Sequence, residues 1–292
     1  MDKLTLEVRK EFSNMSVKEL LKCYNVGKSK IEEIRNNFII KVNNLDVNLD
    51  YLLKEKDRLS FFFTEKINYA PFQLKLDVIY EDDYLLIVNK PSGILIHQDN
   101  KENNQTLVNM VSNYYYEHKI FRNVRYVHRI DEETSGIVIF AKDFLSAGLL
   151  NRMIEKHEIQ RYYLAFCTNK FKNLKGVINK PIGKDRHVNN KYRVGDSINS
   201  KNAITHYQVI NEFKKYSLVK LLLETGRTHQ IRVHMSYLNH PLLGDVLYGG
   251  ESDLIDRVCL HSYQVRFNHP ITNEFLEITC PLAGDLERLV KQ

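Results

Sequence analysis

A carboxylate and an arginine lie two positions apart on a short polar turn that precedes an apolar run. The turn has the sequence His128-Arg129-Ile130-Asp131-Glu132-Glu133-Thr134-Ser135-Gly136, and the following residues predict a buried strand over 136–141. Reactive groups are often carried by loops that a rigid scaffold holds in place. A fixed, ionised carboxylate at Asp131 can act as a nucleophile or a base at a glycosidic carbon. The same side chain could instead cap the turn, because its spacing to Thr134 and Ser135 suits that role.

A second polar block carries basic residues into an expected helix. It runs Leu223-Glu224-Thr225-Gly226-Arg227-Thr228-His229-Gln230-Ile231-Arg232-Val233-His234. Apolar spacing predicts a helix over 228–238, and a start near Thr228 favours capping and anion binding. Arg232 and Arg129 are candidate charge partners for Asp131, since a nearby cation keeps a buried carboxylate ionised. An amphipathic helix with its basic residues facing water is the other interpretation.

Two shorter motifs accompany these blocks. Arg161-Tyr162-Tyr163-Leu164-Ala165 lies on an expected strand, where neighbouring side chains point to opposite faces. One tyrosine is therefore expected in the core and the other beside a cleft. Val88-Asn89-Lys90-Pro91-Ser92-Gly93 predicts a turn after a strand, which by itself indicates little about function.

These blocks resemble, in chain order, the motifs of the RluA/RluD family of RNA pseudouridine synthases. The family patterns are Asn-Lys-Pro-x-Gly, His-Arg-Leu-Asp-x-x-Thr-Ser-Gly, Lys-x-Tyr-x-Ala and Gly-Arg-Thr-His-Gln-Ile-Arg-Val-His, and a fifth match runs from Leu260 to Pro270. The resemblance extends over roughly residues 77–282. Ile130 replaces the usual Leu, and Asn239 stands where a Gly commonly precedes His-Pro. Neither departure changes a charged group.

The resemblance implies a reaction and a catalytic residue. In this family a uridine in RNA is isomerised: the glycosidic C–N bond breaks, and the uracil rotates and rejoins the ribose through carbon. No metal or cofactor is required. The resemblance assigns catalysis to Asp131, and it places Arg232, Tyr163, Arg129, Ile231 and His128 in support of the active site.

Three of these supporting residues have roles that the resemblance specifies. Arg232 pairs with the catalytic aspartate, and Tyr163 stacks on the target base. Arg129 enters the RNA stack once the target uridine is turned out. From the residues alone, Arg129 could equally form a salt bridge to Glu132 or Glu133.

The charge distribution favours a polyanionic partner. The net charge is +6, but residues 161–232 contain fifteen Lys or Arg and four Asp or Glu, giving +11, so the rest of the chain carries −5. A solvated lysine-rich surface is the alternative. The residues expected to contact RNA, with large-subunit ribosomal RNA as the implied partner, are Lys90, Arg161, Lys184, Arg186, Lys191, Arg193, Arg227 and His229.

Two other functions compete with isomerisation. A catalytically inactive RNA-binding or ribosome-assembly protein would keep the basic surface but would not require Asp131, Tyr163 and Arg232 together. A hydrolytic N-glycosidase would need a positioned water and a second carboxylate, for which Glu132 and Glu133 are candidates. It would release free uracil.

No metal site, membrane span or disulfide framework is predicted. His229 and His234 are five residues apart, but no Cys or carboxylate completes a ligand set. The longest apolar runs fall well short of the roughly 18 residues that span a membrane, and the N-terminus lacks the layout of a signal peptide. The four cysteines are far apart, which favours free thiols in a reducing compartment. We expect a cytoplasmic protein, a monomer by default.

The chain predicts two domains of α+β character. Residues 1–66 contain two short helical patterns and strand patterns that resemble an S4-like RNA-binding module, with a plain structural cap as the alternative. Residues 67–76 are an expected linker. Over 77–292, many strands are interrupted by few helices, at 106–116, 144–157 and 228–238, without regular βαβ alternation. This pattern predicts a mixed, largely antiparallel sheet with flanking helices and, from the resemblance, the central cleft of a pseudouridine synthase.

Overall fold

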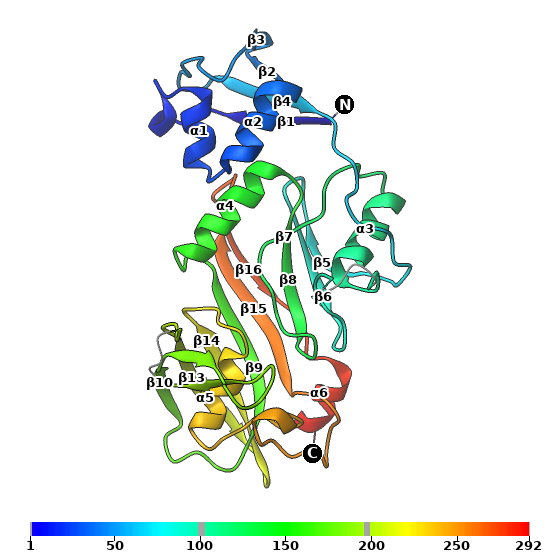
Figure 1. Ribbon diagram of the computed structural model, residues 1–292, viewed down its shortest axis with the longest axis vertical. Helices are drawn as coiled ribbons and strands as arrows, with labels where there is room; N and C mark the ends of the chain where they lie inside the picture. The colour runs from blue at the N-terminus through cyan, green and yellow to red at the C-terminus, as the bar shows by residue number, and fades with distance from the viewer. Residues whose placement is uncertain (1, 99–102, 196–198, 292) are drawn as a thin grey trace.

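The computed structural model describes residues 2–98, 103–195 and 199–291. It shows an elongated molecule with a small module at one end and a long sheet running through the remainder (Figure 1). The N-terminal end of the chain forms part of the module, and the C-terminus lies at the opposite end of the molecule (Figure 1).

The N-terminal module is a four-stranded antiparallel sheet with two helices. The strands are β1 (Asp2–Glu7), β2 (Ile39–Val42), β3 (Leu45–Val47) and β4 (Arg58–Phe63), in the order β1-β4-β2-β3. The helices are α1 (Val17–Cys23) and α2 (Lys28–Asn37), preceded by a short 3-10 turn, η1 (Lys10–Phe12). α1 begins at a capping box in which Ser16 and Glu19 satisfy each other's backbone N–H groups. The two helical patterns and the strand patterns expected within residues 1–66 are present as α1, α2 and strands of this sheet; β1 was not predicted.

A ten-stranded sheet organises the rest of the chain. Its main path is β10-β13-β14-β9-β15-β8-β6-β5, with β16 paired to β15 and β7 paired to β8. The strands are β5 (Asp77–Glu81), β6 (Leu85–Lys90), β7 (Arg125–Tyr126), β8 (Ser135–Ala141), β9 (Gln160–Thr168), β10 (Lys175–Asn179), β13 (Ile204–Glu212), β14 (Tyr216–Leu223), β15 (Leu260–Asn268) and β16 (Phe275–Thr279). Among the pairings of these ten strands in the described residues, β15–β8 alone is parallel. The prediction of a mixed, largely antiparallel sheet is confirmed.

Helices cover both faces of this sheet. The helices are α3 (Leu107–Glu117), α4 (Phe144–Glu155), α5 (Gln230–Tyr237) and α6 (Gly284–Val290), and η2 (Val246–Tyr248) is a 3-10 turn. β8 is buried along its whole length because alternate side chains meet different helices. Val138 and Phe140 share a hydrophobic cluster with α3, whereas Ile137 and Ile139 share one with α4. A continuous apolar run is the pattern expected of a strand buried on both faces.

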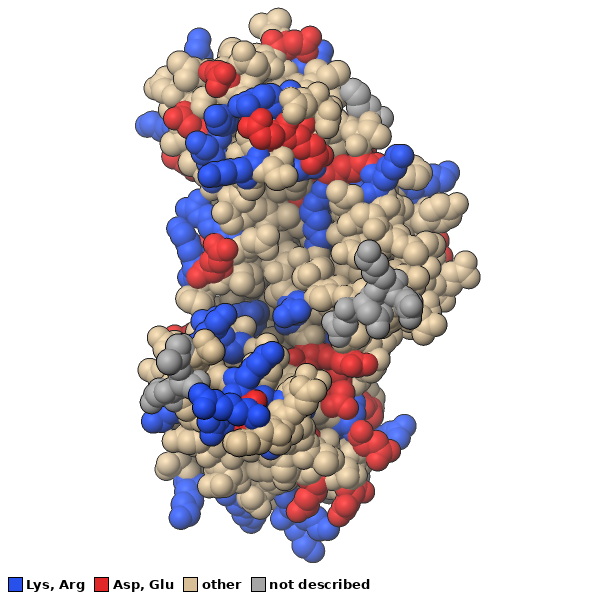
Figure 2. Space-filling model, viewed as in Figure 1, with Lys and Arg blue, Asp and Glu red and all other residues tan. Residues whose placement is uncertain are grey.

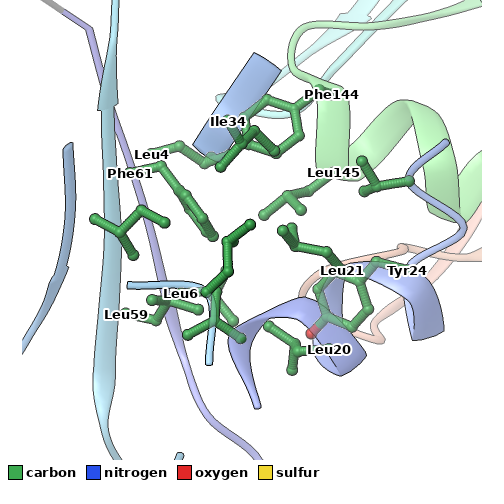
Figure 3. Close-up of a cluster of buried hydrophobic side chains, with 14 of the residues drawn as sticks. Leu4, Leu6, Leu20, Leu21, Tyr24, Ile34, Leu59, Phe61, Phe144 and Leu145 are labelled. Carbon is green, nitrogen blue, oxygen red and sulfur yellow. The ribbon is translucent and has the colours of Figure 1, made fainter. Parts of the chain in front are cut away.

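The module packs directly on α4. Phe144 and Leu145 of α4 belong to the same hydrophobic cluster as Leu21 and Phe61 of the module (Figure 3). α4 itself begins at Asp143, a buried N-cap whose carboxylate accepts from the backbone N–H groups of Leu145 and Ser146.

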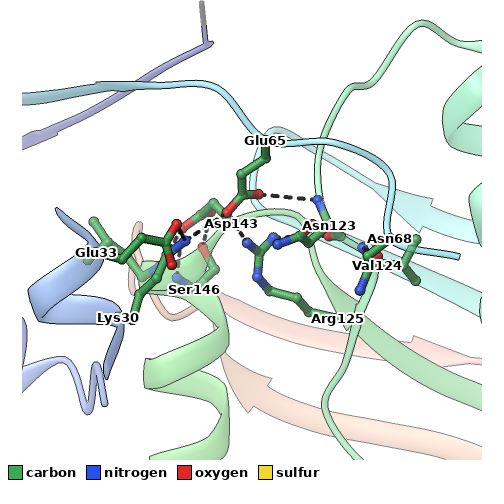
Figure 4. Close-up of polar contacts among 10 residues, drawn as sticks. Lys30, Glu33, Glu65, Asn68, Asn123, Val124, Arg125, Asp143 and Ser146 are labelled. Carbon is green, nitrogen blue, oxygen red and sulfur yellow. Dashed lines mark hydrogen bonds and ion pairs between the residues drawn. The ribbon is translucent and has the colours of Figure 1, made fainter. Parts of the chain in front are cut away.

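A polar network closes the same junction (Figure 4). The buried carboxylate of Glu65 accepts from Lys30 Nζ at 3.1 Å, from Asn123 N at 3.2 Å and from Arg125. Burial would raise the pKa of Glu65, but these partners, Arg125 foremost, hold it below its usual value. Residues 64–76 contain no helix or strand, yet Ser112 and Asn109 of α3 donate to backbone carbonyls at positions 69 and 70. The segment is therefore fixed against α3.

Candidate active site

A cleft of about 1000 Å³ brings together the sequence motifs. One wall comes from the turn that precedes β8 and from the segment around His97. The other comes from the end of β14, the loop that follows it and the start of α5. The volume is at the upper end of the range of ordinary ligand sites. Asp131 lies among the lining residues, with 28% of its side chain exposed.

Hydrogen bonds from the neighbouring Asn-Lys-Pro turn hold the turn that carries Asp131 in place. Lys90 is completely buried, and its ammonium donates to the carbonyl oxygens of Pro91 at 2.9 Å, Ile94 at 2.7 Å and Glu132 at 2.7 Å. Ser92 Oγ donates to the carbonyl of Glu133 at 2.6 Å. The prediction that Lys90 contacts RNA phosphates is therefore wrong, because this lysine joins two loops and has no access to a ligand.

A glycine at the start of β8 completes the support of the turn. Gly136 has a φ of +106°, and a Cβ at this position would lie 2.2 Å from the carbonyl oxygen of Ser262 on β15. Only glycine permits both this backbone conformation and this close approach. The parallel contact between β8 and β15 thus depends on the residue type at the end of the Asp131 turn.

Arg232 pairs with two carboxylates. Its Nε and Nη2 donate to Asp245 at 2.7 and 2.8 Å in a bidentate arrangement, and its Nη1 lies 3.7 Å from Asp131 Oδ2. The expected pairing with Asp131 is present, but the closer partner is Asp245, which the sequence did not single out. Burial would lower the pKa of Arg232, but Asp245 and then Asp131 raise it above its usual value. The guanidinium is therefore a permanent cation beside Asp131.

His229 lies at the centre of the site. Its Nε2 is 4.0 Å from Asp131 Oδ2, and its Nδ1 is hydrogen-bonded to the Tyr248 hydroxyl at 2.9 Å. Burial is the main cause that lowers the pKa of His229, and Arg232 adds to it against the opposing charge of Asp131. His229 also has a φ of +56°, so α5 begins one residue later, at Gln230. The predicted helix start near Thr228 was two residues early.

The floor of the cleft is formed largely by β9 and α5. Tyr163 and Ile231 belong to one hydrophobic cluster, and both line the cleft. Arg161, two positions before Tyr163 and on the same face of β9, also lines it and is buried. His128 is buried behind the Asp131 turn, and its Nε2 accepts from the backbone N–H of Ile139 at 3.3 Å. Burial lowers the pKa of His128 to about 3, and Arg161 contributes.

Comparison with known proteins assigns the chain to a family. Residues 84–237 match the RNA pseudouridylate synthase family. The chain is 39% identical over 269 residues to the uncharacterized RNA pseudouridine synthase YhcT of Bacillus subtilis, covering 91% of this chain and 88% of the relative. It is 35% identical over 241 residues to ribosomal large subunit pseudouridine synthase D of Vibrio vulnificus, covering 78% of this chain and 73% of the relative.

The chain belongs to the RNA pseudouridylate synthase family. It is therefore an RNA pseudouridine synthase, an isomerase that acts on uridine in RNA. The fold agrees: human RNA pseudouridylate synthase domain containing 4 superposes with a TM-score of 0.62 at 23% identity, over 74% of this chain and 92% of that chain.

Arg129 is at the rim of the synthase cleft. It is exposed, and its Nη1 lies 3.1 Å from Nε2 of His97. The His97 ring stacks on Tyr126 with the centroids 5.2 Å apart. In the described part of the chain Arg129 forms no salt bridge with Glu132 or Glu133, which was the alternative interpretation.

A basic hairpin extends the wall formed by α5. Its strands are β11 (Ile182–Lys184) and β12 (Tyr192–Val194), and Tyr192 N donates to the Tyr248 hydroxyl at 2.9 Å. Tyr192 lines the cleft together with Arg227, whose Nε donates to the carbonyl of Asn202. Lys184, Arg186 and Arg193 are exposed on this hairpin, and Lys191 is half-buried over the Tyr248 ring. Lys and Arg gather over this end of the molecule, around β10, β13 and α5 (Figure 2).

Within residues 2–98, 103–195 and 199–291, no group of three His, Cys, Asp or Glu side chains is arranged to hold a metal ion. The same residues include no helix that is long and apolar enough to cross a membrane. All four cysteines are free thiols, as predicted.

Asp245, Tyr248 and His97 are the site residues that the sequence did not reveal. Asp245 and Tyr248 follow Arg232 by 13 and 16 positions, in the stretch His240-Pro241-Leu242-Leu243-Gly244-Asp245 and just beyond it. The available signal was an Asp and a Tyr in a largely apolar segment after a helix that carries a buried arginine. A buried arginine needs an anionic partner, so this Asp was a candidate.

Proposed function

We propose that this synthase converts uridines of large-subunit ribosomal RNA to pseudouridine, with Asp131 as the catalytic residue. The observation that carries the proposal is the position of Asp131: a partly exposed carboxylate facing a nucleotide-sized cleft, with Arg232 3.7 Å away and its turn fastened by Lys90. The choice of RNA rests on the relatives named as large-subunit pseudouridine synthases, of which the Vibrio vulnificus protein is 35% identical.

In this reaction the Asp131 carboxylate must assist cleavage of the glycosidic bond. The bond between N1 of uracil and C1′ of ribose breaks, and its electron pair leaves with the base. A carboxylate at the anomeric centre assists this step as a nucleophile or as a base. The base then turns, C5 bonds to C1′, the proton on C5 is lost, and N1 gains a proton. Atoms and electrons balance without water, metal or cofactor.

Two groups fix the Asp131 carboxylate for this step. Arg232 offers a permanent positive charge, and its bidentate contact with Asp245 prevents it from rotating away from the cleft. His229, held by Tyr248, fills the space on the same side of the carboxylate. Prepositioned charges of this kind are effective because they need no reorganisation during the reaction.

The target uridine must leave the RNA stack to reach this cleft. Extrusion of a base costs a few kcal/mol. Arg129, exposed at the rim, is placed to fill the gap in the stack, since a planar guanidinium stacks on bases. Tyr163 on the floor offers an aromatic surface to the extruded base, a contact that contributes about 1–3 kcal/mol per base. The basic hairpin supplies phosphate contacts that position the RNA.

Mapping of modified sites tests the proposal. Total RNA from cells that lack this protein is treated with a carbodiimide, and alkali-resistant adducts are located by primer extension. We expect particular stops in large-subunit ribosomal RNA to disappear and to return on expression of the wild-type chain but not of Asp131→Asn. Loss of sites in transfer RNA alone would refute the proposed substrate, and restoration by Asp131→Asn would refute the proposed catalyst.

A further inference from the structure

Arg161 is a buried cation that has no partner in the described part of the chain. It is 6% exposed on β9, and its Nε has no hydrogen-bond acceptor. Among residues 2–98, 103–195 and 199–291, no carboxylate forms an ion pair with it and no acceptor receives a hydrogen bond from it. Other buried cations are satisfied: Lys90 by three carbonyls and Arg232 by Asp245.

The guanidinium of Arg161 faces the active-site cleft. Arg161 and Tyr163 are two positions apart on β9, so both point to the same side, and both line the cleft. The three atoms nearest to a Cβ added at Gly226 would all belong to Arg161, with Nη1 at 3.1 Å. The glycine of the Gly-Arg-Thr-His-Gln block therefore leaves room for this guanidinium. His128, also buried, lines the same cleft.

An unpaired buried charge indicates a ligand. Removing a guanidinium from water without an anion or acceptors costs several kcal/mol. Because such a group persists here at the floor of a binding cleft, we expect an electron-rich ligand atom to reach it. Among the parts of an extruded nucleotide, the phosphates remain joined to the RNA strand at the rim, whereas the base inserts deepest. Arg161 therefore meets the base.

The charge of the base changes during the reaction. Uracil is neutral in the nucleoside, but it carries a negative charge, spread over N1, O2 and O4, once the N1–C1′ bond has broken. Burial is the main cause that raises the pKa of Tyr163, and the charges of Arg161 and Asp131 both act on its hydroxyl, so both charged residues lie near this ring. A cation beside the base is complementary to the detached anion and not to the intact nucleoside.

We propose that Arg161 is a second catalytic residue, which stabilises the uracil anion released by cleavage of the glycosidic bond and retains it until C5 bonds to C1′. This inference rests on the proposed role of Asp131. The symmetry of uracil fits the assignment. Rotation about the axis through N3 and C6 exchanges N1 with C5 and O2 with O4, so a guanidinium that faces one carbonyl oxygen before the turn faces an equivalent oxygen after it.

The test compares two leaving groups. Single-turnover consumption of the target nucleoside is measured with uridine-containing RNA and with the same RNA carrying 5-fluorouridine, whose base is a more stable anion because fluorine withdraws electrons. Arg161→Met should slow the uridine reaction about 100-fold, as expected for loss of one preorganised transition-state donor. Its defect on 5-fluorouridine should be at least several-fold smaller. Arg161→Lys, which retains the charge, should recover part of the uridine rate.

Matched measurements separate this role from binding and from folding. In the Asp131→Asn background, Arg161→Met should bind RNA as the parent does, whereas Arg227→Met, at the exposed side of the cleft, should weaken binding. In the otherwise wild-type enzyme, Arg227→Met should show equal rate defects on both substrates. Arg161→Met should melt at the same temperature as the wild type or higher, because an uncompensated buried charge has been removed. Equal rate defects on both substrates, a weakened Kd that accounts for the loss, or a lowered Tm would each overturn the proposal. If the wild-type enzyme forms no pseudouridine, the proposed function itself fails.

Discussion

The contact between Arg232 and Asp245 predicts that stability and catalysis are separable at this site. Both side chains are buried, and two charge-assisted hydrogen bonds at 2.7 and 2.8 Å join them. Removal of one member of a buried pair leaves an uncompensated charge and costs about 3–5 kcal/mol. Replacement of both members by apolar residues of similar size is often neutral.

Three variants form the test: Arg232→Met, Asp245→Leu and the double variant. We expect each single variant to lose at least about 3 kcal/mol of unfolding free energy, equivalent to a decrease in Tm of about 6 °C or more at roughly 2–4 °C per kcal/mol. The double variant should regain most of this stability. Its rate of pseudouridine formation should remain at least about 100-fold below that of the wild type, because Asp131 has lost its fixed cation.

Urea unfolding and a tritium-release assay on RNA with [5-³H]uridine measure the two quantities. Asp131→Asn is the matched control: its ion pair with Arg232 is longer, 3.7 Å, and partly exposed, so its effect on stability should be below about 1 kcal/mol. A double variant as unstable as the single variants, or one that regains activity, would refute the reasoning.

Three further predictions concern the surrounding structure. Lys90→Met should slow the reaction about 100-fold, because the Asp131 turn loses its hydrogen bonds from Lys90. The Kd for RNA should be unchanged, and an increased Kd would show that Lys90 contacts RNA after all. Burial lowers the pKa of His128 from 6.5 to about 3, so its contribution to stability is complete above pH 6.5 and declines as the pH falls toward 3. His128→Gln should therefore reduce the slope of unfolding free energy against pH by about 1.4 kcal/mol per unit between pH 6 and 4, and an unchanged slope would show that His128 titrates normally. Replacement of Lys184, Arg186 and Arg193 by Ser should lower the slope of log K against log salt by about 2; an unaltered slope would exclude the hairpin from the interface.

The catalytic sheet was predictable because its strands have distinctive patterns. The run that follows Gly136 is apolar without interruption and is bounded by a polar turn, as a strand covered on both faces requires. Helices at 106–116 and 144–157 were placed within two residues of α3 and α4, since their apolar spacing is regular. Local patterns were sufficient for these elements.

Other elements depend on contacts between distant residues. β1 is a strand because it pairs with β4, more than fifty positions away, and α6 was not apparent from its short sequence. The start of α5 shifts because His229 adopts a left-handed conformation and its ring is hydrogen-bonded to Tyr248. Such a contact between side chains that are 19 positions apart leaves no periodic signal.

The motifs located the active site but misassigned one of its residues. Asp131 and Arg232 were identified, and the structure places them 3.7 Å apart. Lys90 was expected to contact the RNA from its place in the Asn-Lys-Pro turn, but it is buried. Its three carbonyl acceptors come together only when the turn at 90–94 meets the turn at 131–134. Asp245 was overlooked for the same reason, since its partner becomes visible only in the folded chain.

Purified Asp131→Asn protein tests the central assignment most directly. The substitution preserves size and removes the negative charge that faces the cleft. Under single-turnover conditions, with RNA bound to the same extent, we predict that the wild type releases tritium from C5 of the target uridine without free uracil, and that Asp131→Asn releases none above background. Tritium release by Asp131→Asn at the wild-type rate would contradict the account.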